Sequence, residues 1–408
     1  MTLIVQKYGG TSVGSPALIR RVAARVASVR ASGSNIAVVV SAMGDSTDRL
    51  VDLANAVCAR PGPRELDMLL ASGEQVSVAL LAMALADLGC PARSYTGPQL
   101  PVRTTSVHGR ARIESVGVAA IVSDLAAGLV PVVAGFQGVA ADGNITTIGR
   151  GGSDTTAVAL AVALRADECQ ILTDVDGVYT TDPRVVPNAR RLARLTFDEM
   201  LELAGQGSRV LHLRSVEFAR KYQMPLRVAS SHAAGAGTLI SEGDSAVEAP
   251  IVAGIAFNPD EAGISVVGVP VGAGVTHALL EPLAAAEIEV DMIVLNASRD
   301  GTLDVSFTVH RRDHEEALRL VTAAAAKMPC TSVGGEPNLA KLAVVGVGIR
   351  SHTNVAARFF GALAREGIAV RMVSTSEIKI AVIVDEAQLE QGVRALHREF
   401  EADIGKNP

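Results

Sequence analysis

The feature that most constrains the fold is a short, unbroken apolar run, N-I-A-V-V-V-S-A-M, from Asn35 to Met43. Such a run is typical of a strand in a parallel sheet that is buried on both faces. The chain around it alternates strand-like runs with helical stripes, which predicts an α/β sandwich with a mainly parallel sheet. We expect strands at Thr2–Lys7, Val130–Ala134 and Gln170–Thr173, a hairpin near Asp142–Ile148, and helices from Ser15, over Glu65–Leu88 and over Thr155–Leu164.

The first glycine-rich turn, K-Y-G-G-T-S, lies between the first strand and the first helix, with Lys7 just before Gly9 and Gly10. Free backbone N–H groups and the helix dipole attract an anion at such a place, and Lys7 adds a full charge. The turn matches neither the P-loop, where the lysine follows the glycines, nor the dinucleotide fingerprint. It therefore predicts a phosphate cradle of another architecture, with Lys7 in a solvated loop.

A second glycine-rich turn, G-R-G-G-S-D-T-T, runs from Gly149 to Thr156 and opens a helix. Ser153 and Asp154 could simply be helix caps. Three glycines and Arg150 exceed what a cap needs, and an arginine can hold a carboxylate or phosphate through two hydrogen bonds. We therefore expect an anion-binding turn here.

A third stretch, T-D-V-D-G-V-Y-T-T-D-P-R, runs from Thr173 to Arg184. Its D-G and D-P pairs are ordinary turn dipeptides, so a structural role alone is an open alternative. As a nucleotide loop, it would offer Asp174 to ribose hydroxyls or a metal, Tyr179 to the base and Arg184 to phosphates. A lone Glu74 within an apolar stretch is either a surface or capping residue, or a partner for an ammonium group.

The composition excludes some classes of binding partner for this chain. The net charge of the 408-residue chain is −6 and the charges are spread, which argues against nucleic acid. The four cysteines are far apart, without a C-x-x-C pair or a histidine at metal spacing, so we expect reduced thiols and no metal held by side chains alone. The N-terminus lacks a charged-then-apolar signal, and the apolar run Val76–Leu88 is short enough to be a core helix. We expect a cytoplasmic protein without a membrane segment.

The C-terminal part repeats itself after a linker near Ser230–Pro250. The segment L-A-A-A-E-I-E-V-D-M-I at Leu283–Ile293 returns as L-A-R-E-G-I-A-V-R-M-V at Leu363–Val373, about eighty residues later. Each copy is predicted to run strand, loop, helix, strand, strand, helix, so two copies of one small α+β unit are expected. The pair could be a packing or dimerisation module, or a small-ligand sensor.

Taken together and in this order, the motifs resemble those of the aspartate kinase family. K-Y-G-G-T-S, S-A-M-G, A-S-G-E, A-G-F-Q-G, G-R-G-G-S-D-T-T and T-D-V-D-G-V-Y-T-T-D-P-R span the catalytic part. The resemblance implies an amino-acid kinase domain of the carbamate kinase-like, three-layer kind over residues 1–246. Two ferredoxin-like ACT domains would follow over 247–335 and 336–408, with interleaved boundaries.

The resemblance also implies a reaction, L-aspartate and ATP giving 4-phospho-L-aspartate and ADP, on the route to lysine, threonine, methionine and diaminopimelate. Mg²⁺ would be carried with the nucleotide. Catalytic roles would fall to Lys7 and Asp154. The implied substrate residues are Ser41, Thr47, Glu74, Phe136, Arg150, Gly151, Gly152, Ser153 and Asp154. The implied ATP residues are Lys7, Tyr8, Gly9, Gly10, Thr173, Asp174, Tyr179, Asp182, Arg184 and Arg209.

Regulation departs from the family pattern. The stretches V-P-V-G-A-G-V-T at Val269–Thr276 and G-I-R-S-H-T-N-V at Gly348–Val355 lack the acidic residue that would hold an effector's ammonium. We therefore expect a weak response to lysine and threonine, in a homodimer built through the ACT domains or in an α₂β₂-type assembly. The candidate effector residues are Gly274, Asp291, Asn296, Ser376 and Glu377, of which Asp291 and Glu377 could replace part of the missing charge.

Two alternatives stay open. Another amino-acid kinase, such as a glutamate kinase, would share the fold, although the K-Y-G-G-T-S start and the paired repeat favour aspartate. A catalytically inactive amino-acid sensor is also possible, although every charged residue of the motifs is present.

Overall fold

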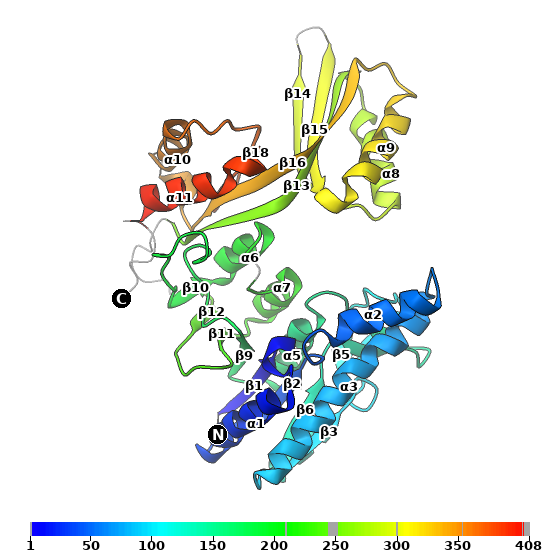
Figure 1. Ribbon diagram of the computed structural model, residues 1–408, viewed down its shortest axis with the longest axis vertical. Helices are drawn as coiled ribbons and strands as arrows, with labels where there is room; N and C mark the ends of the chain where they lie inside the picture. The colour runs from blue at the N-terminus through cyan, green and yellow to red at the C-terminus, as the bar shows by residue number, and fades with distance from the viewer. Residues whose placement is uncertain are drawn as a thin grey trace. The chain divides into compact units, whose positions relative to one another are not determined.

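The computed structural model describes residues 2–208, 210–243, 252–298, 301–352, 354–401 and 403. The chain divides into two compact units (Figure 1). Unit 1 consists of residues 1–178, 191–204 and 209–247, and unit 2 of residues 179–190, 205–208 and 248–408.

Unit 1 is built on an eight-stranded sheet. Its order is β10 (Arg194–Thr196), β12 (Thr238–Ser241), β11 (Leu226–Ser230), β9 (Glu168–Thr173), β1 (Leu3–Tyr8), β2 (Asn35–Val40), β6 (Val130–Ala134) and β3 (Ala92–Tyr95). All neighbours pair in parallel except β11 with β12. The mainly parallel sheet predicted from the sequence is confirmed.

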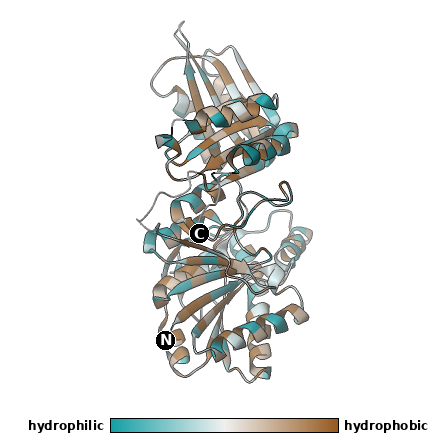
Figure 2. Cartoon of the chain, turned by 90° about the vertical axis from the view of Figure 1, so that its left-hand side faces the viewer, coloured by the Kyte–Doolittle hydropathy of each residue, from teal (hydrophilic) through white to brown (hydrophobic). Residues whose placement is uncertain are grey.

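Helices cover both faces of this sheet. On one face, Ile36, Val38 and Val40 of β2 join the core cluster formed with α1 and α3, and the alternate residues Ala37 and Val39 are equally buried on the other face. Strand β2 is thus buried on both sides, as its apolar run predicted, and the central strands are coloured largely hydrophobic in Figure 2. The helices of unit 1 are α1 (Pro16–Ala31), α2 (Ser46–Val57), α3 (Pro63–Asp87), α4 (Ala119–Ala126), α5 (Gly152–Leu164), α6 (Phe197–Gly205) and α7 (Leu213–Tyr222).

A smaller four-stranded sheet completes unit 1. Its order is β5 (Ile113–Val116), β4 (Val102–Thr104), β7 (Gln137–Ala140) and β8 (Ile145–Thr147). Strands β7 and β8 form the predicted hairpin, and β8 packs against α3.

Helix α3 is long and apolar enough to cross a membrane by length and composition alone. In the structure it packs on α1, α2 and both sheets of unit 1, and its buried face includes two carboxylates, Asp67 and Glu74. These contacts are those of a core helix, as expected from the sequence.

Unit 2 contains a six-stranded antiparallel sheet that follows the predicted repeat. The first copy is β13 (Gly254–Pro270), α8 (Val275–Ala285), β14 (Val290–Ala297), β15 (Thr302–His310) and α9 (His314–Ala325). The second copy is β16 (Ser332–Val345), α10 (Asn354–Arg365), β17 (Met372–Thr375), β18 (Lys379–Asp385) and α11 (Leu389–Phe400). The long strands β13 and β16 lie side by side (Figure 1) and pair along most of their length. Short 3₁₀ turns occur at Gly10–Ser12, Arg311–Asp313, Ile349–Ser351 and Glu386–Gln388.

Some boundaries differ from the sequence-based expectation. Strand β2 ends at Val40, so that Ser41–Met43 form the turn into α2. Helix α5 begins at Gly152, three residues earlier than expected, because Gly151 takes up a left-handed conformation with φ of 67° and starts the helix directly from the glycine-rich turn.

Candidate active site

An ion pair joins the two glycine-rich turns. Lys7 Nζ on β1 lies 2.6 Å from Asp154 Oδ1 in the first turn of α5. Lys7 is only 9% exposed, so the expectation that it lies in a solvated loop is wrong. The pair places a positive and a negative group side by side at the carboxyl end of the sheet, where ligands of parallel sheets bind.

The turn after β1 lies against the turn after β2. Gly44 N donates to Gly10 O at 3.0 Å, and a Cβ on Gly10 would come within 2.8 Å of Ala42 O. Only glycine allows this close approach. The Tyr8 ring is fully buried, and its hydroxyl donates to Gln6 Oε1 at 3.0 Å.

Glu74 lies in the middle of α3 and is 3% exposed. Its Oε1 accepts a hydrogen bond from Ala42 N at 3.1 Å, whereas its Oε2 has no partner among the described residues. Burial raises the pKa of this carboxyl to about 7, and the bond from Ala42 opposes that shift. A buried acid with one unused oxygen is suited to a cationic ligand.

The remaining substrate candidates on this side lie at the strand ends. Ser41 directly follows β2, and its N donates to Tyr8 O at 3.1 Å. Thr47 lies in the first turn of α2. Both are half-buried, so their hydroxyl groups lie near the surface of the unit.

Phe136 has a φ of 66°, which is rare for a residue with a large side chain. Its N–H donates to Thr156 Oγ1 at 3.2 Å and its carbonyl accepts from Ile148 N at 2.9 Å. The preceding Gly135 is so close to α5 that a Cβ there would lie 2.7 Å from the Ser153 side chain. The conformation of Phe136 is thus held by the strands and helix around it, as is usual for strained residues at functional sites.

Arg150 is exposed at the tip of the second turn, while Gly151 and Gly152 pack beneath it. A Cβ on Gly151 would lie within 2.1 Å of the His212 ring, which therefore covers this glycine. His212 was not predicted from the sequence as a site residue. Burial lowers the pKa of its imidazole, and its Nδ1 has no hydrogen-bond partner among the described residues. Its only signal in the sequence is its place directly before helix α7.

The predicted nucleotide residues fall in both units. In unit 1, Thr173 ends β9 and its hydroxyl donates to Asp174 Oδ1 at 3.0 Å. In unit 2, Asp182 accepts hydrogen bonds from Nε and Nη2 of the Arg184 guanidinium, which hold the pKa of Asp182 below its usual value. Tyr179 begins the same segment of unit 2, and Arg209 lies outside the described residues.

The chain has close relatives among known proteins. Residues 2–230 match the amino acid kinase family, and residues 342–400 match the ACT domain. The aspartokinase of Pseudomonas aeruginosa is 56% identical over 405 residues, with 99% of this chain and 98% of that protein covered. The structure of Escherichia coli aspartokinase III in complex with aspartate and ADP matches with a TM-score of 0.84 at 27% identity, over 98% of this chain and 100% of that one. The chain belongs to the aspartate kinase family.

Membership of the aspartate kinase family confirms the fold and the enzyme class expected from the motifs. The activity is the phosphorylation of the side-chain carboxylate of L-aspartate. The second repeat copy matches the ACT domain, and the first copy has the same order of strands and helices.

The residues predicted from the sequence as effector contacts all lie in unit 2. Gly274 is the N-cap of α8 and has a φ of 93°, and Asn296 lines a cavity of about 390 Å³. Asp291 is ion-paired with the buried Lys341, so its negative charge already has a partner. Glu377, next to Ser376 in the turn after β17, lies 3.3 Å from Arg350.

No three His, Cys, Asp or Glu side chains of the described residues lie together as a metal cluster. Mg²⁺ in kinase sites usually binds through one or two carboxylates together with phosphate oxygens. Asp174 is exposed at the carboxyl end of β9 and, with the Thr173 hydroxyl, offers oxygen atoms of this kind.

Proposed function

We propose that the phosphoryl donor is ATP carried with Mg²⁺, and that transfer to aspartate takes place at the strand ends around the Lys7–Asp154 ion pair. The observation that carries the proposal is this pair of opposite charges, held between β1 and α5 where parallel strands end. Ligands of open parallel sheets gather at such ends.

Aspartate is held at its amino-acid end in this proposal. Arg150 binds the α-carboxylate, and the free Oε2 of Glu74 accepts the α-ammonium. Ser41, Thr47, Phe136 and Ser153 line the same pocket. The β-carboxylate is then left facing Lys7 and the γ-phosphate.

The chemistry needs charge neutralisation rather than a base. A carboxylate with a pKa near 4 is already ionised at neutral pH and acts as the nucleophile directly. Its oxygen forms a bond to the γ-phosphorus while the bond to the β,γ-bridging oxygen breaks and ADP leaves. Lys7 and the N–H groups of Gly9 and Gly10 stabilise the transferring group, and Asp154 orients Lys7. Mg²⁺ bound by Asp174 would neutralise phosphate charge.

The remaining ATP residues are those proposed from the sequence. Thr173 and Asp174 lie at the end of β9 in unit 1. Tyr179, Asp182 and Arg184 follow them in the chain. Arg209 completes the set.

We further propose a homodimer assembled through the ACT units, with a weak response to lysine and threonine. Edge strands β14 and β17 expose Ile293, Leu295 and Val373, which suits an assembly surface. A related Escherichia coli structure is described as a complex with lysine and aspartate. Here the acids nearest the repeat loops are engaged with Lys341 and Arg350, which supports a weaker hold on an effector's ammonium.

The substitution Arg150→Lys tests the proposed substrate site. Lysine keeps the charge but loses the two-pronged contact, so the KM for aspartate should rise roughly tenfold or more while the KM for ATP changes little. Arg93→Lys is the matched control, because Arg93 pairs with Asp124 in the same unit and outside the glycine turns. An unchanged aspartate KM in Arg150→Lys would contradict the proposal.

A further inference from the structure

Helix α3 carries a second buried carboxylate besides Glu74. Asp67 is 1% exposed and lies seven residues earlier, two turns of helix away and on the same face. At 1.5 Å per residue the two positions are about 10 Å apart along the axis. None of the aspartate or ATP roles proposed above uses Asp67.

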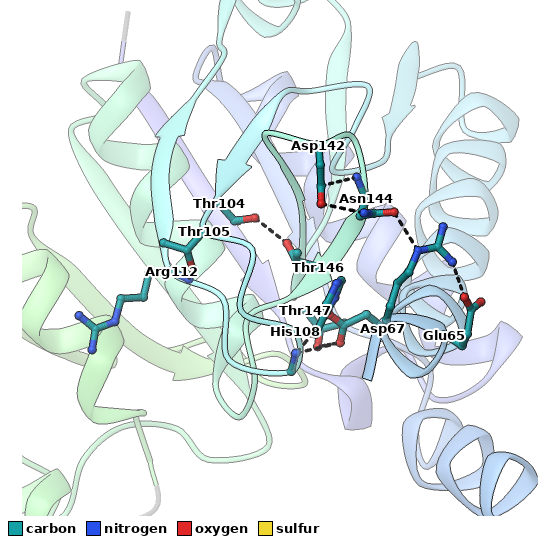
Figure 3. Close-up of polar contacts among 12 residues, drawn as sticks. Glu65, Asp67, Thr104, Thr105, His108, Arg112, Asp142, Asn144, Thr146 and Thr147 are labelled. Atoms are coloured by element: carbon teal, nitrogen blue, oxygen red, sulfur yellow. Dashed lines mark hydrogen bonds and ion pairs between the residues drawn. The ribbon is translucent and has the colours of Figure 1, made fainter. Parts of the chain in front are cut away.

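Three donors converge on Asp67 (Figure 3). His108 Nδ1 lies 2.7 Å from Oδ2, Gly109 N donates to both oxygens at 3.0 and 3.1 Å, and Thr147 Oγ1 donates to Oδ1 at 2.6 Å. Hydrogen bonds to an ionised carboxylate are short and strong, and losing them inside a protein is costly. Asp67 therefore ties β8 and the loop around Gly109 firmly to α3.

The residues tied in this way form the stem of the Arg150 turn. Thr147 ends β8, and its carbonyl accepts from Ala111 N at 3.0 Å. Gly149, two residues later, has a φ of 84° and is so close to Gly109 that a Cβ on it would lie 2.8 Å from Gly109 O. The backbone that leads into Arg150 thus rests on the loop that Asp67 holds.

The same stem has a second support. Arg214 of α7 donates to Ile148 O at 2.7 Å and to Ala111 O at 3.2 Å. Arg214 holds the stem from α7, whereas Asp67 holds it from the helix that also carries Glu74. The Asp67 contacts tie the backbone that leads into the Arg150 turn directly to the helix that carries Glu74.

We propose that Asp67 is a positioning residue that fixes the distance between the Arg150 turn and Glu74, and thereby sets the preference for aspartate over longer amino acids. The inference rests on the proposed roles of Arg150 and Glu74. If these two charges hold the amino-acid end, their spacing decides where the side-chain carboxylate lies, and a shift of about 1 Å can change the rate by on the order of a hundredfold. Glutamate is longer by one methylene, so loosening the spacing should favour it relatively.

The test is Asp67→Asn, assayed with aspartate and with glutamate. The asparagine side chain keeps one acceptor oxygen but cannot accept hydrogen bonds from all three donors. We expect the aspartate KM to rise and the ratio of kcat/KM for aspartate over glutamate to fall, each roughly tenfold, while the ATP KM changes less than about twofold. Thr146→Val is the matched control, because its buried hydroxyl pairs with Thr104 in the same sheet at 2.6 Å without touching Asp67.

A second pair of variants covers the case that Asp67→Asn does not fold. Thr147→Val removes one of the three donors and should lower the ratio of kcat/KM for aspartate over glutamate by a smaller factor. Thr147→Ser keeps the hydroxyl and should restore the wild-type ratio. A lower melting temperature with an unchanged ratio in these variants would overturn the inference and leave Asp67 a purely structural residue. If Arg150→Lys raises the aspartate KM but the Asp67 and Thr147 variants keep the wild-type substrate preference, only this inference fails. If Arg150→Lys leaves the aspartate KM unchanged, the proposed function itself is contradicted.

Discussion

The raised pKa of Glu74 predicts that aspartate binding weakens in mild acid. With a pKa of about 7 in the free protein, the carboxyl is roughly nine-tenths ionised at pH 8 and roughly one-tenth ionised at pH 6. Only the ionised form attracts the substrate's ammonium group. The affinity for aspartate should therefore fall about tenfold between pH 8 and pH 6.

The substitution Glu74→Gln should abolish this pH dependence. The amide keeps the acceptor for Ala42 N but loses the charge, so aspartate should bind roughly ten- to a hundredfold more weakly at pH 8, with an affinity nearly constant down to pH 6. Calorimetry of aspartate binding without ATP is the suitable measurement, because the ATP phosphates then contribute no titration. Glu199→Gln is the matched control, since Glu199 is also buried but lies on α6 and accepts from Thr196.

The same shift predicts a stability change in the aspartate-free protein. The pKa of about 7 in the folded protein lies above the ordinary glutamate pKa of 4.5, so the stabilisation from protonated Glu74 is fully present below pH 4.5 and is lost as the pH rises through 7. The free energy of unfolding should fall by about 2–3 kcal/mol more in the wild type than in Glu74→Gln between pH 5 and pH 8.

Two binding results would refute the reasoning. One is a wild-type aspartate affinity that does not change between pH 8 and pH 6, and the other is a Glu74→Gln variant whose affinity changes with pH as much as that of the wild type.

Three further outcomes are expected. Lys7→Ala should lower kcat by roughly two to four powers of ten and also destabilise the fold, because Asp154 loses its buried counter-charge; near-normal turnover would remove Lys7 from the mechanism. Gly135→Ala should lower kcat/KM at least about tenfold, since its Cβ would meet Ser153 at 2.7 Å; full activity would show that the turn can relax. Lysine and threonine at millimolar concentration should inhibit initial rates only weakly, whereas strong sub-millimolar inhibition would contradict the weak-effector proposal.

The sheet and the glycine turns could be predicted because their signals are local. An apolar run such as Asn35–Met43 is most stable in a strand that is covered on both faces. The structure buries Ile36–Val40 of this run on both faces. The turns at Gly9–Gly10 and Gly149–Gly152 combine glycines with charges in a few consecutive residues. Such patterns reflect the physics of one segment and need no knowledge of its partners.

Residues whose role depends on distant partners were harder to predict. Lys7 was expected in a solvated loop because its counter-charge, Asp154, is far away in sequence. Asp67 resembles an ordinary acid of a helix surface until His108, Gly109 and Thr147 are brought to it.

The sequence likewise did not predict that segment 179–190 packs within unit 2. Its pattern is that of a loop continuing the catalytic part. In the structure, Val186 joins the core of the second repeat copy and Thr180 hydrogen-bonds His397 of α11. Contacts between residues so far apart in the sequence depend on tertiary packing rather than on local conformational preference.

Trapping the product with hydroxylamine tests the central claim most directly, because hydroxylamine converts an acyl phosphate into a hydroxamate. With ATP and Mg²⁺, the protein should form aspartate hydroxamate in amounts equal to the ADP released, far less hydroxamate with glutamate, and none without an amino acid. ADP release without hydroxamate, or equal yields from aspartate and glutamate, would contradict phosphorylation of the aspartate side chain in a site that fixes the amino-acid end.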